Sequence, residues 1–480
     1  MVQTQPTLRG ILPIVALMAL LSATGVAVVG ACAEPIRAIE QYPWLEDYFP
    51  YGFWMADGGI ANKLAEALGE PYEARREKIM HDLSRHHVNA LIPACRVVGP
   101  GYLNAAQRFG IRCATMPLYL YRHVDNAGNL KDKDLQWVKD QWSGHARQIK
   151  DHPALLAYHV FDEPHPTVSP KIQQITDLLT QVDPLHPAIY THQNLPLDRD
   201  NPSWGAPEWS LLDSLNVVCS DMYSIGPEWG RDPWAYGDVG MAQFRRVDPD
   251  AVHWPIIQAF AFRAAPTIPE VRVMIFHTIA CGAKGVLLFT TEQSYARWIN
   301  GFYPSVGNPW FAEEPLWADI SRIGRHLTSA GPLLMPRRLD PDYPVRVDTP
   351  NFRARVRTGW LREDGDLRRP AVHVGAFVGD DFDILVVHND DPWQTRSGRV
   401  TVDGRGRCVY DLRTLRQVRT RISGDRVAFT VRFEPGDGRL YLVGDQADFA
   451  GARATVQRHL YQHESLQVGL DAGIAAKAGV

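Results

Sequence analysis

Short apolar runs recur along the first two thirds of the chain, and segments with helical periodicity separate several of them. A short apolar run bounded by turn-forming residues is typical of a strand buried on both faces of a parallel sheet. On this pattern we predict strands at residues 51–55, 88–94, 111–120, 154–161, 188–192, 217–222, 255–260 and 285–289.

Charged, periodic segments between these runs predict helices at residues 70–85, 134–150, 170–182 and 268–280. Strands that alternate with helices over this length predict a (β/α)8 TIM barrel, which typically takes about 250 residues. An open, doubly wound sheet is the alternative, but it normally carries a glycine-rich phosphate loop. The sequence contains no Gly-x-Gly-x-x-Gly motif and no P-loop.

From Pro344 the pattern changes to period two, with alternating polar and apolar residues divided by Gly-Asp, Asp-Gly and Asn-Asp turns. This pattern is typical of antiparallel strands with one buried face. We therefore predict a β-sandwich domain over residues 341–445, after a catalytic barrel over residues 34–338. Residues 446–480 are rich in Ala and Gly and are predicted to form a C-terminal tail, in which one helix could form.

The N-terminus predicts export from the cytoplasm. Arg9 precedes an uncharged stretch rich in Leu, Val and Ala that ends in small residues, so we predict a signal peptide over residues 1–33. The residues that end at Cys32 also resemble the lipobox of bacterial lipoproteins, in which Cys32 would carry a lipid. A retained membrane anchor is a third alternative, which a proline and several glycines in the stretch weaken. We expect a secreted or periplasmic protein, with a lipid anchor at Cys32 as the second alternative.

The 480-residue composition, 45% hydrophobic and 22% charged, is ordinary for a globular protein. A net charge of -4 gives no global field that would attract nucleic acid, so we expect no nucleic-acid partner, and membrane contact only through Cys32. The six cysteines are scattered, and no Cys-x-x-Cys spacing indicates a metal. The sequence thus predicts neither a metal nor a cofactor.

One predicted strand, at residues 154–161, runs directly into two adjacent carboxylates, Asp162 and Glu163. In closed barrels the carboxyl ends of the strands form the mouth that carries the chemistry. The alternative is that Asp162 caps the following helix and that Glu163 is merely solvated. Two acids in tandem make that alternative weaker.

The tripeptide Asp162-Glu163-Pro164 resembles the Asn-Glu-Pro or Asp-Glu-Pro that closes the fourth strand in many TIM-barrel glycoside hydrolases. The preceding His-Pro-Ala-Leu at residues 152–155 is similar to the entry to that strand in many members. The resemblance implies a glycosidase barrel in which Glu163 is the general acid/base, followed by a β-sandwich. Retaining relatives carry a second Glu at the end of strand seven, where this sequence has Gln258. An amide is no nucleophile, so the chain departs from the family pattern there.

Three acids could fill the second catalytic role. Asp162 is the first, because a tandem Asp-Glu here resembles hexosaminidases in which the Asp orients the 2-acetamido group of the sugar, which itself attacks. Asp221, at the end of the sixth predicted strand, is the second, although it could only hydrogen-bond a sugar hydroxyl. Glu292, after the eighth predicted strand, is the third, and it could simply orient a neighbouring side chain.

Polar and aromatic residues near the predicted strand ends suit a ligand covered in hydroxyl groups, because flat aromatic faces stack on the C–H faces of sugars. A single Trp is more often a packing residue, but several lie near these strand ends. The predicted substrate-binding residues are Trp54, Asp57, His192, Asn194, Tyr223, Trp229, Gln258 and Trp298.

Together these features predict a glycoside hydrolase that cleaves O-glycosidic bonds of an oligo- or polysaccharide, with Glu163 as general acid/base and Asp162 as the residue that would assist a substrate acetamido group. The competing hypothesis is a non-catalytic carbohydrate-binding surface protein that has kept the barrel. Gln258 favours the second hypothesis, whereas another acid within about 5 to 10 Å of Glu163 would favour the first.

Overall fold

The computed structural model describes residues 37–55, 65–66, 68–93, 98–118, 132–163, 169–193, 215–226, 230–248, 250–259, 261–262, 266–289, 299–300, 315–356, 365–404 and 407–478. The predicted signal peptide lies outside these ranges. Within them, no helix combines the length and apolar character needed to cross a membrane.

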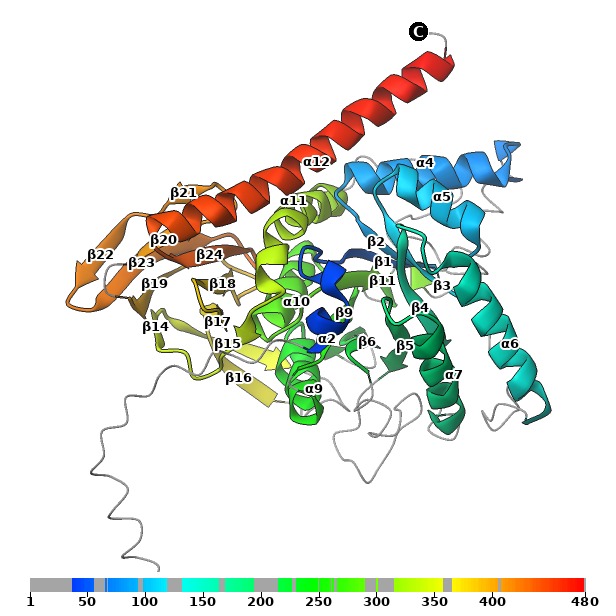
Figure 1. Ribbon diagram of the computed structural model, residues 1–480. Helices are drawn as coiled ribbons and strands as arrows, with labels where there is room; N and C mark the ends of the chain where they lie inside the picture. Colours follow the sequence, from blue (N-terminus) through cyan, green and yellow to red (C-terminus); the bar gives the residue numbers. More distant parts are fainter. Residues whose placement is uncertain are drawn as a thin grey trace, which may run out of the picture. The chain divides into compact units, whose positions relative to one another are not determined.

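Parallel strands close into a barrel in the order β1-β11-β9-β6-β5-β4-β3-β2 (Figure 1). Its strands are β1 (Tyr51–Met55), β2 (Ala90–Pro93), β3 (Arg112–Thr115), β4 (Leu155–Asp162), β5 (Ala188–Gln193), β6 (Val217–Asp221), β9 (Val252–Gln258) and β11 (Val286–Phe289). These are the eight strands predicted from the apolar runs, so the predicted TIM barrel is confirmed and the open sheet is excluded.

Helices follow most barrel strands and cover the barrel. They are α4 (Tyr72–Arg85), α5 (Pro100–Arg108), α6 (Asp132–Ile149), α7 (Ser169–Val182), α9 (Ala242–Val247), α10 (Ile268–Ala280) and α11 (Pro315–Ala330). A short helix α2 (Arg37–Gln41) and the turn η1 (Pro43–Leu45) precede β1, a π-helix η4 (Tyr236–Met241) precedes α9, and the 3-10 turn η5 (Gly331–Leu334) follows α11. Two small antiparallel strand pairs accompany the loops: β7 (Ile225–Gly226) pairs with β8 (Gly230–Arg231), and β10 (Ala261–Phe262) pairs with β12 (Ile299–Asn300).

Helix α10 begins where the sequence predicts, because a capping box fixes its start. The Thr267 hydroxyl accepts from the Glu270 amide at 3.4 Å, and the Glu270 carboxylate accepts from the Thr267 amide at 2.7 Å. Such reciprocal bonds satisfy amides that the first turn leaves without helical partners.

An antiparallel β-sandwich follows the barrel, as predicted, and its inner faces form a separate apolar cluster. One sheet contains β13 (Arg338–Leu339), β17 (Val372–Val378), β18 (Asp383–Asn389), β24 (Gly438–Gly444), β20 (Cys408–Asp411) and β21 (Arg416–Gln417). The other contains β14 (Val345–Asp348), β19 (Arg396–Asp403), β23 (Arg426–Phe433) and β22 (Thr420–Ser423), and β15 (Asn351–Val356) pairs with β16 (Gly365–Pro370). Buried and exposed residues alternate along β15 and β23, as period-two sequences require.

The long helix α12 (Gln446–Ala478) contacts both domains (Figure 1). Near its start, Phe449 stacks on Tyr410 of β20 with ring centroids 3.9 Å apart. Further along, a ring nitrogen of His463 lies 2.9 Å from the carbonyl oxygen of Ser84 at the end of α4. Most of the segment expected to be a tail is therefore one helix that holds the barrel and the sandwich together.

Candidate active site

The fourth barrel strand ends irregularly. Its register against β5 shifts between His159 and Phe161, and Glu163, which follows the strand, has a φ of 48°. The Glu163 amide donates to the Thr191 carbonyl oxygen at 2.8 Å, which holds this turn against β5. A non-glycine residue in the left-handed region is uncommon and persists where the surrounding structure holds it, often at functional sites. Bulges likewise re-aim side chains beside active sites.

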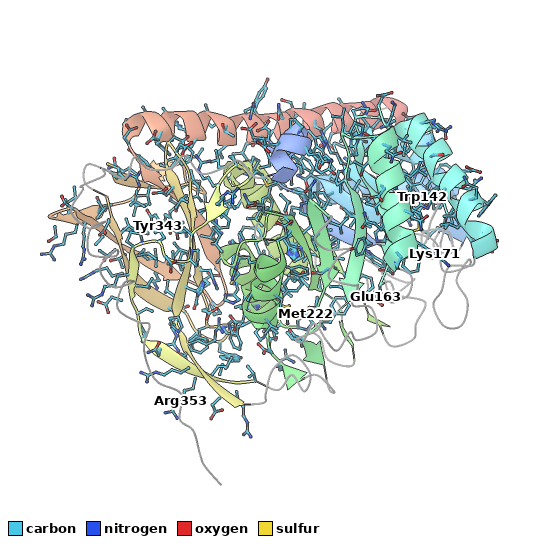
Figure 2. The ribbon with its side chains drawn as sticks, turned by 60° about the horizontal axis from the view of Figure 1, so that its bottom comes forward. Trp142, Glu163, Lys171, Met222, Tyr343 and Arg353 are labelled. Carbon is cyan, nitrogen blue, oxygen red and sulfur yellow. The ribbon has the colours of Figure 1, made fainter. Side chains whose placement is uncertain are left out.

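Three carboxyl groups meet at this end of the barrel, and we call Asp162, Glu163 and Asp221 the carboxyl cluster. Asp221 is the last residue of β6, and its carboxyl group hydrogen-bonds that of Glu163. The Tyr223 hydroxyl also hydrogen-bonds Asp221. Glu163 and Met222, the neighbour of Asp221, lie toward the same end of the barrel in Figure 2. Two carboxyl groups can hydrogen-bond each other only if one of them holds a proton, so the pair is built to share one.

Burial raises the pKa of all three groups. The pKa of Asp162 lies well above its ordinary value because of burial and the charge of Glu163. Burial also raises the pKa of Glu163, and the hydrogen bond from Asp221 opposes part of that rise. Burial raises the pKa of Asp221 well above its ordinary value, and the charges of Glu163 and Asp162 raise it further. The cluster therefore retains protons at a pH where isolated carboxyl groups have lost them.

Aromatic rings stand beside the carboxyl cluster. Tyr223 stacks on Phe289 of β11 with centroids 5.7 Å apart, and Phe289 meets Trp54 of β1 edge-on at 5.0 Å. Trp54 also meets the buried ring of His159 at 6.5 Å, and its indole Nε1 is buried with no hydrogen-bond partner among the described groups. The sequence did not predict Phe289 and His159 at the site. Phe289 is the last residue of a predicted strand, and this position at a strand end could have indicated that it lies at the barrel mouth.

Gln258 ends β9, the seventh strand of the barrel, where the retaining relatives are expected to carry a glutamate. Its amide oxygen accepts from the Ile225 amide at 3.0 Å, and its amide nitrogen donates to the Ile225 carbonyl at 2.7 Å. The side chain has no solvent exposure. Gln258 thus clamps the loop that follows β6, and direct contact with a substrate stays a prediction.

The other predicted site residues are not placed. Asp57, Asn194, Trp229, Glu292 and Trp298 lie outside the described residues, and of His192 only the backbone, within β5, is described. The structure thus brings together Asp162, Glu163, Asp221 and Tyr223 with Trp54 close by, and the convergence of the remainder stays a prediction.

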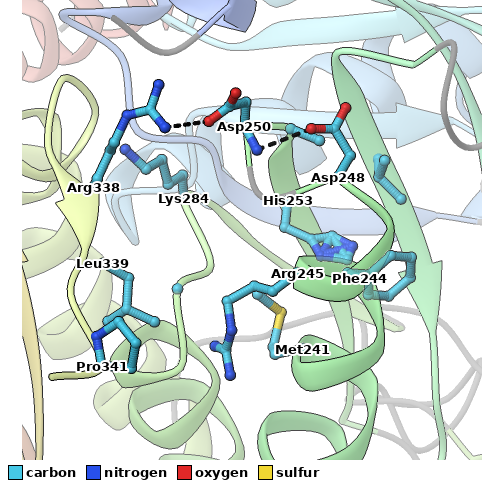
Figure 3. Close-up of a pocket in the computed structure, with 13 residues that line it drawn as sticks. Met241, Phe244, Arg245, Asp248, Asp250, His253, Lys284, Arg338, Leu339 and Pro341 are labelled. Carbon is cyan, nitrogen blue, oxygen red and sulfur yellow. Dashed lines mark hydrogen bonds and ion pairs between the residues drawn. The ribbon is translucent and has the colours of Figure 1, made fainter. Parts of the chain in front are cut away.

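A cavity of about 320 Å³ lies at the other end of the barrel (Figure 3). Val218 and His253, which line it, are near the starts of β6 and β9, whereas the carboxyl cluster follows strand ends. The Nζ of Lys284 donates to the Leu334 carbonyl at 2.9 Å beside this cavity. In TIM barrels the face at the strand starts serves stability and the opposite face serves catalysis, so we assign the candidate active site to the carboxyl cluster.

The chain thus combines a closed parallel barrel, which carries acids at the carboxyl ends of its strands, with a C-terminal β-sandwich. No family model matches the chain, and no curated protein matches its sequence. Solved structures do match. A β-galactosidase from Bacillus circulans sp. alkalophilus aligns with a TM-score of 0.55 and 9% identity over 84% of this chain and 99% of that one. A cold-adapted β-galactosidase from Rahnella sp. R3 aligns with a TM-score of 0.55 and 8% identity over 82% and 98%. At these identities the likeness shows the fold, which is that of TIM-barrel glycoside hydrolases, and it confirms the resemblance at that level.

Proposed function

We propose that the protein is a glycoside hydrolase that cleaves O-glycosidic bonds of an oligo- or polysaccharide, with Glu163 as general acid/base. The observation that carries the proposal is the carboxyl cluster at the barrel mouth. A glycosidic oxygen needs a proton as its bond breaks, and the raised pKa of Glu163 keeps that proton available. The partly exposed rings of Phe289 and Tyr223 offer apolar surface of the kind that sugars stack on, and the buried Trp54 packs against Phe289.

The hydrogen bond between Glu163 and Asp221 bears on the mechanism. Retaining glycosidases place their two carboxyl groups about 5–5.5 Å apart, and inverting enzymes about 6.5–9.5 Å apart, with substrate between them. Two groups that hydrogen-bond each other leave no such gap. We therefore assign Asp221 to positioning Glu163 and supplying its proton, and not to the far side of the scissile bond.

The anionic or nucleophilic role then belongs to Asp162, through a substrate acetamido group, or to Glu292. Asp162 stands next to Glu163 in the carboxyl cluster, which supports substrate assistance. An acetamido N–H that donated to Asp162 would favour its carboxylate form and lower its raised pKa, because hydrogen bonds to the charged form stabilise it.

A panel of aryl-glycosides and natural saccharides, with and without 2-acetamido groups, tests the proposal. We expect hydrolysis of at least one sugar class by the wild type. Under substrate assistance, Asp162→Asn should be badly impaired on N-acetylated sugars. The matched control Asp177→Asn, at an exposed position of α7, should hydrolyse them normally. If Glu292 supplies the anion, Glu292→Gln should be the more damaging change. Sugar binding without any hydrolysis across the panel would overturn the proposal in favour of a carbohydrate-binding protein, which the amide at Gln258 would suit.

We also propose that the chain is exported, through cleavage after Ala33 or lipid attachment at Cys32. The apolar stretch that follows Arg9 supports this. Mass analysis of the mature protein from its source should find a new N-terminus at residue 34, or at a lipid-modified Cys32. An intact Met1 terminus on cytoplasmic protein would contradict the proposal.

A further inference from the structure

Three histidines meet where α10 packs against the six-stranded sheet, and with Asp390 we call them the histidine cluster: His277 of α10, His373 of β17 and His388 of β18. One ring nitrogen of each lies within 4.8 Å of the others. The ring centroids are 5.0, 5.4 and 5.4 Å apart. His373 and His388 are directly opposite in the antiparallel ladder, so both project from the same face of the sheet.

Close backbone packing brings the helix to this face. A Cβ on Gly375 of β17 would lie 2.0 Å from the Ala280 carbonyl oxygen at the end of α10, so only glycine allows the approach. The contact joins an element of the barrel to the C-terminal sandwich. The resulting cluster draws its donors from both domains.

Several donor atoms in this cluster have no hydrogen-bond partner among the described groups, although they are buried. They are Nδ1 of His277, both ring nitrogens of His388 and Oδ1 of Asp390. His388 and Asp390 are fully buried, and His277 is 1% exposed. Buried polar atoms without partners are costly, and when several face one another they indicate a group that would satisfy them together.

The spacing of these atoms suits a metal ion. Oδ1 of Asp390 lies 3.6 Å from Nδ1 of His277 and 4.0 Å from Nε2 of His388. Around a tetrahedral zinc ion with bonds of about 2.0–2.1 Å, neighbouring donor atoms are roughly 3.4 Å apart. The observed separations, up to 4.8 Å between the imidazole nitrogens, are longer than this, so the side chains would move inward to share one ion.

The surroundings orient the donors as a metal site requires. Nε2 of His277 lies 2.8 Å from Oδ1 of Asp238, which leaves Nδ1 to face the cluster. Arg369 donates to Oδ2 of Asp238 at 2.6 Å and to Oδ2 of Asp390 at 2.5 Å, which leaves Oδ1 of Asp390 for the cluster. Ligating histidines commonly have a carboxylate on the other ring nitrogen, which fixes the tautomer and the ring orientation.

We propose that His277, His373, His388 and Asp390 bind one zinc ion that joins α10 to the C-terminal sandwich. Imidazole and carboxylate donors in a closed set of four are typical of zinc, and a site without an open coordination position is structural. His373 is only half-buried, which gives the ion a route of entry. The site is separate from the carboxyl cluster and does not depend on the proposed hydrolase activity.

A metal-free network is the competing arrangement, with His277 protonated between Asp238 and Asp390. That network leaves both nitrogens of His388 without a hydrogen-bond partner in the described part of the chain, so His388 distinguishes the two. The test measures zinc by elemental mass spectrometry in wild-type protein that has been stripped with a chelator, exposed to excess zinc and desalted. We expect about one zinc per chain in the wild type and loss of that zinc in His388→Gln and His373→Gln.

His326→Gln is the matched control. His326 is also buried between the barrel and the sandwich, where its Nε2 accepts from the Leu440 amide at 3.1 Å, but it stands outside the cluster. This variant should keep its zinc, although it too loses a contact between the domains. The chelator should lower the thermal unfolding midpoint of the wild type and of His326→Gln, and should leave that of His388→Gln unchanged.

Cobalt substitution decides the case if His388→Gln fails to fold. Cobalt(II) in the wild-type site should show the strong visible absorption of four-coordinate geometry, which added zinc should abolish. The proposal is overturned if the stripped wild type takes up no zinc, if folded His388→Gln retains as much zinc as the wild type, or if bound cobalt shows only the weak spectrum of octahedral coordination.

Discussion

The carboxyl cluster at the barrel mouth and the histidine cluster behind α10 both gather buried ionisable groups, but their charges are arranged in opposite ways. At the mouth, burial and like charges raise the pKa values of Asp162 and Asp221. Behind α10, burial alone would raise the pKa of Asp238, yet His277 and Arg369 together hold it well below its ordinary value. Like charges are often buried together where they serve chemistry, whereas opposite charges buried as a compensated pair are costly to separate.

The largest effect should come from a substitution in the carboxyl cluster at the barrel mouth, and it should appear in turnover. Glu163→Gln keeps the size of the side chain and removes its proton, so turnover of a natural saccharide should fall by about 100- to 10,000-fold. The free energy of unfolding should change little or rise, because a buried acid is replaced by a neutral amide. Steady-state kinetics and denaturant unfolding measure the two quantities.

Glu77→Gln, on the outer surface of the barrel, is the control and should leave turnover unchanged. An activated aryl-glycoside needs less protonation of its leaving group, so Glu163→Gln should lose less rate on it. Undiminished hydrolysis of a natural substrate by Glu163→Gln would remove Glu163 from the mechanism.

The second largest effect should come from the ion pairs of Arg369 beside the histidine cluster, and it should appear in the free energy of unfolding. Arg369→Met leaves Asp238 and Asp390 without their shared cation, and breaking a buried ion pair in this way typically costs about 3–5 kcal/mol. Arg426→Met breaks the exposed pair with Asp403, in which both side chains are more than half exposed, and should cost under about 1 kcal/mol. Urea unfolding of zinc-stripped protein compares the two variants. Equal costs would show that the network around Arg369 is not a stabilising one.

A smaller, pH-dependent effect should follow from Asp221→Asn. A carboxyl group whose pKa is raised on folding binds more protons in the folded state, so its contribution to stability is present in acid and is lost as the pH rises through the folded pKa. The variant removes one such group. Near neutral pH the variant should therefore unfold at a higher denaturant concentration than the wild type, with a free energy of unfolding that is about 0.5–2 kcal/mol higher. This difference should shrink toward pH 4. A difference that grows in acid would reverse the sign assigned to Asp221.

The predictability of the two regions from sequence also differs. The barrel could be predicted because its strands are short apolar runs, and the bounds of β1 and α10 were predicted correctly from an apolar run and a helix-start signal. Asp162 and Glu163 could be placed at the mouth because they end one such run. The order of the strands, which sequence periodicity cannot detect, was needed to place Asp221 near Glu163, because β4 and β6 both pair with β5.

The histidine cluster could not be predicted in this way. His277, His373 and His388 are far apart along the chain and match no short metal-binding motif, so the sequence predicted no metal. They meet because one helix of the barrel packs on the sandwich, which is a tertiary contact. Gln258 was misleading for a related reason, since nothing local to it signals that its amide clamps the backbone of Ile225.

The central claim is that Glu163, with its raised pKa, donates the proton at the mouth, and the pH dependence of kcat/KM tests it most directly. For the wild type on a natural saccharide, whose leaving group needs a proton, activity should fall on the alkaline side as pH rises through the raised pKa of Glu163, because the acid is then ionised. In Glu163→Gln that alkaline fall should disappear while a residual rate remains. An alkaline limb with the same midpoint in both proteins would contradict the account.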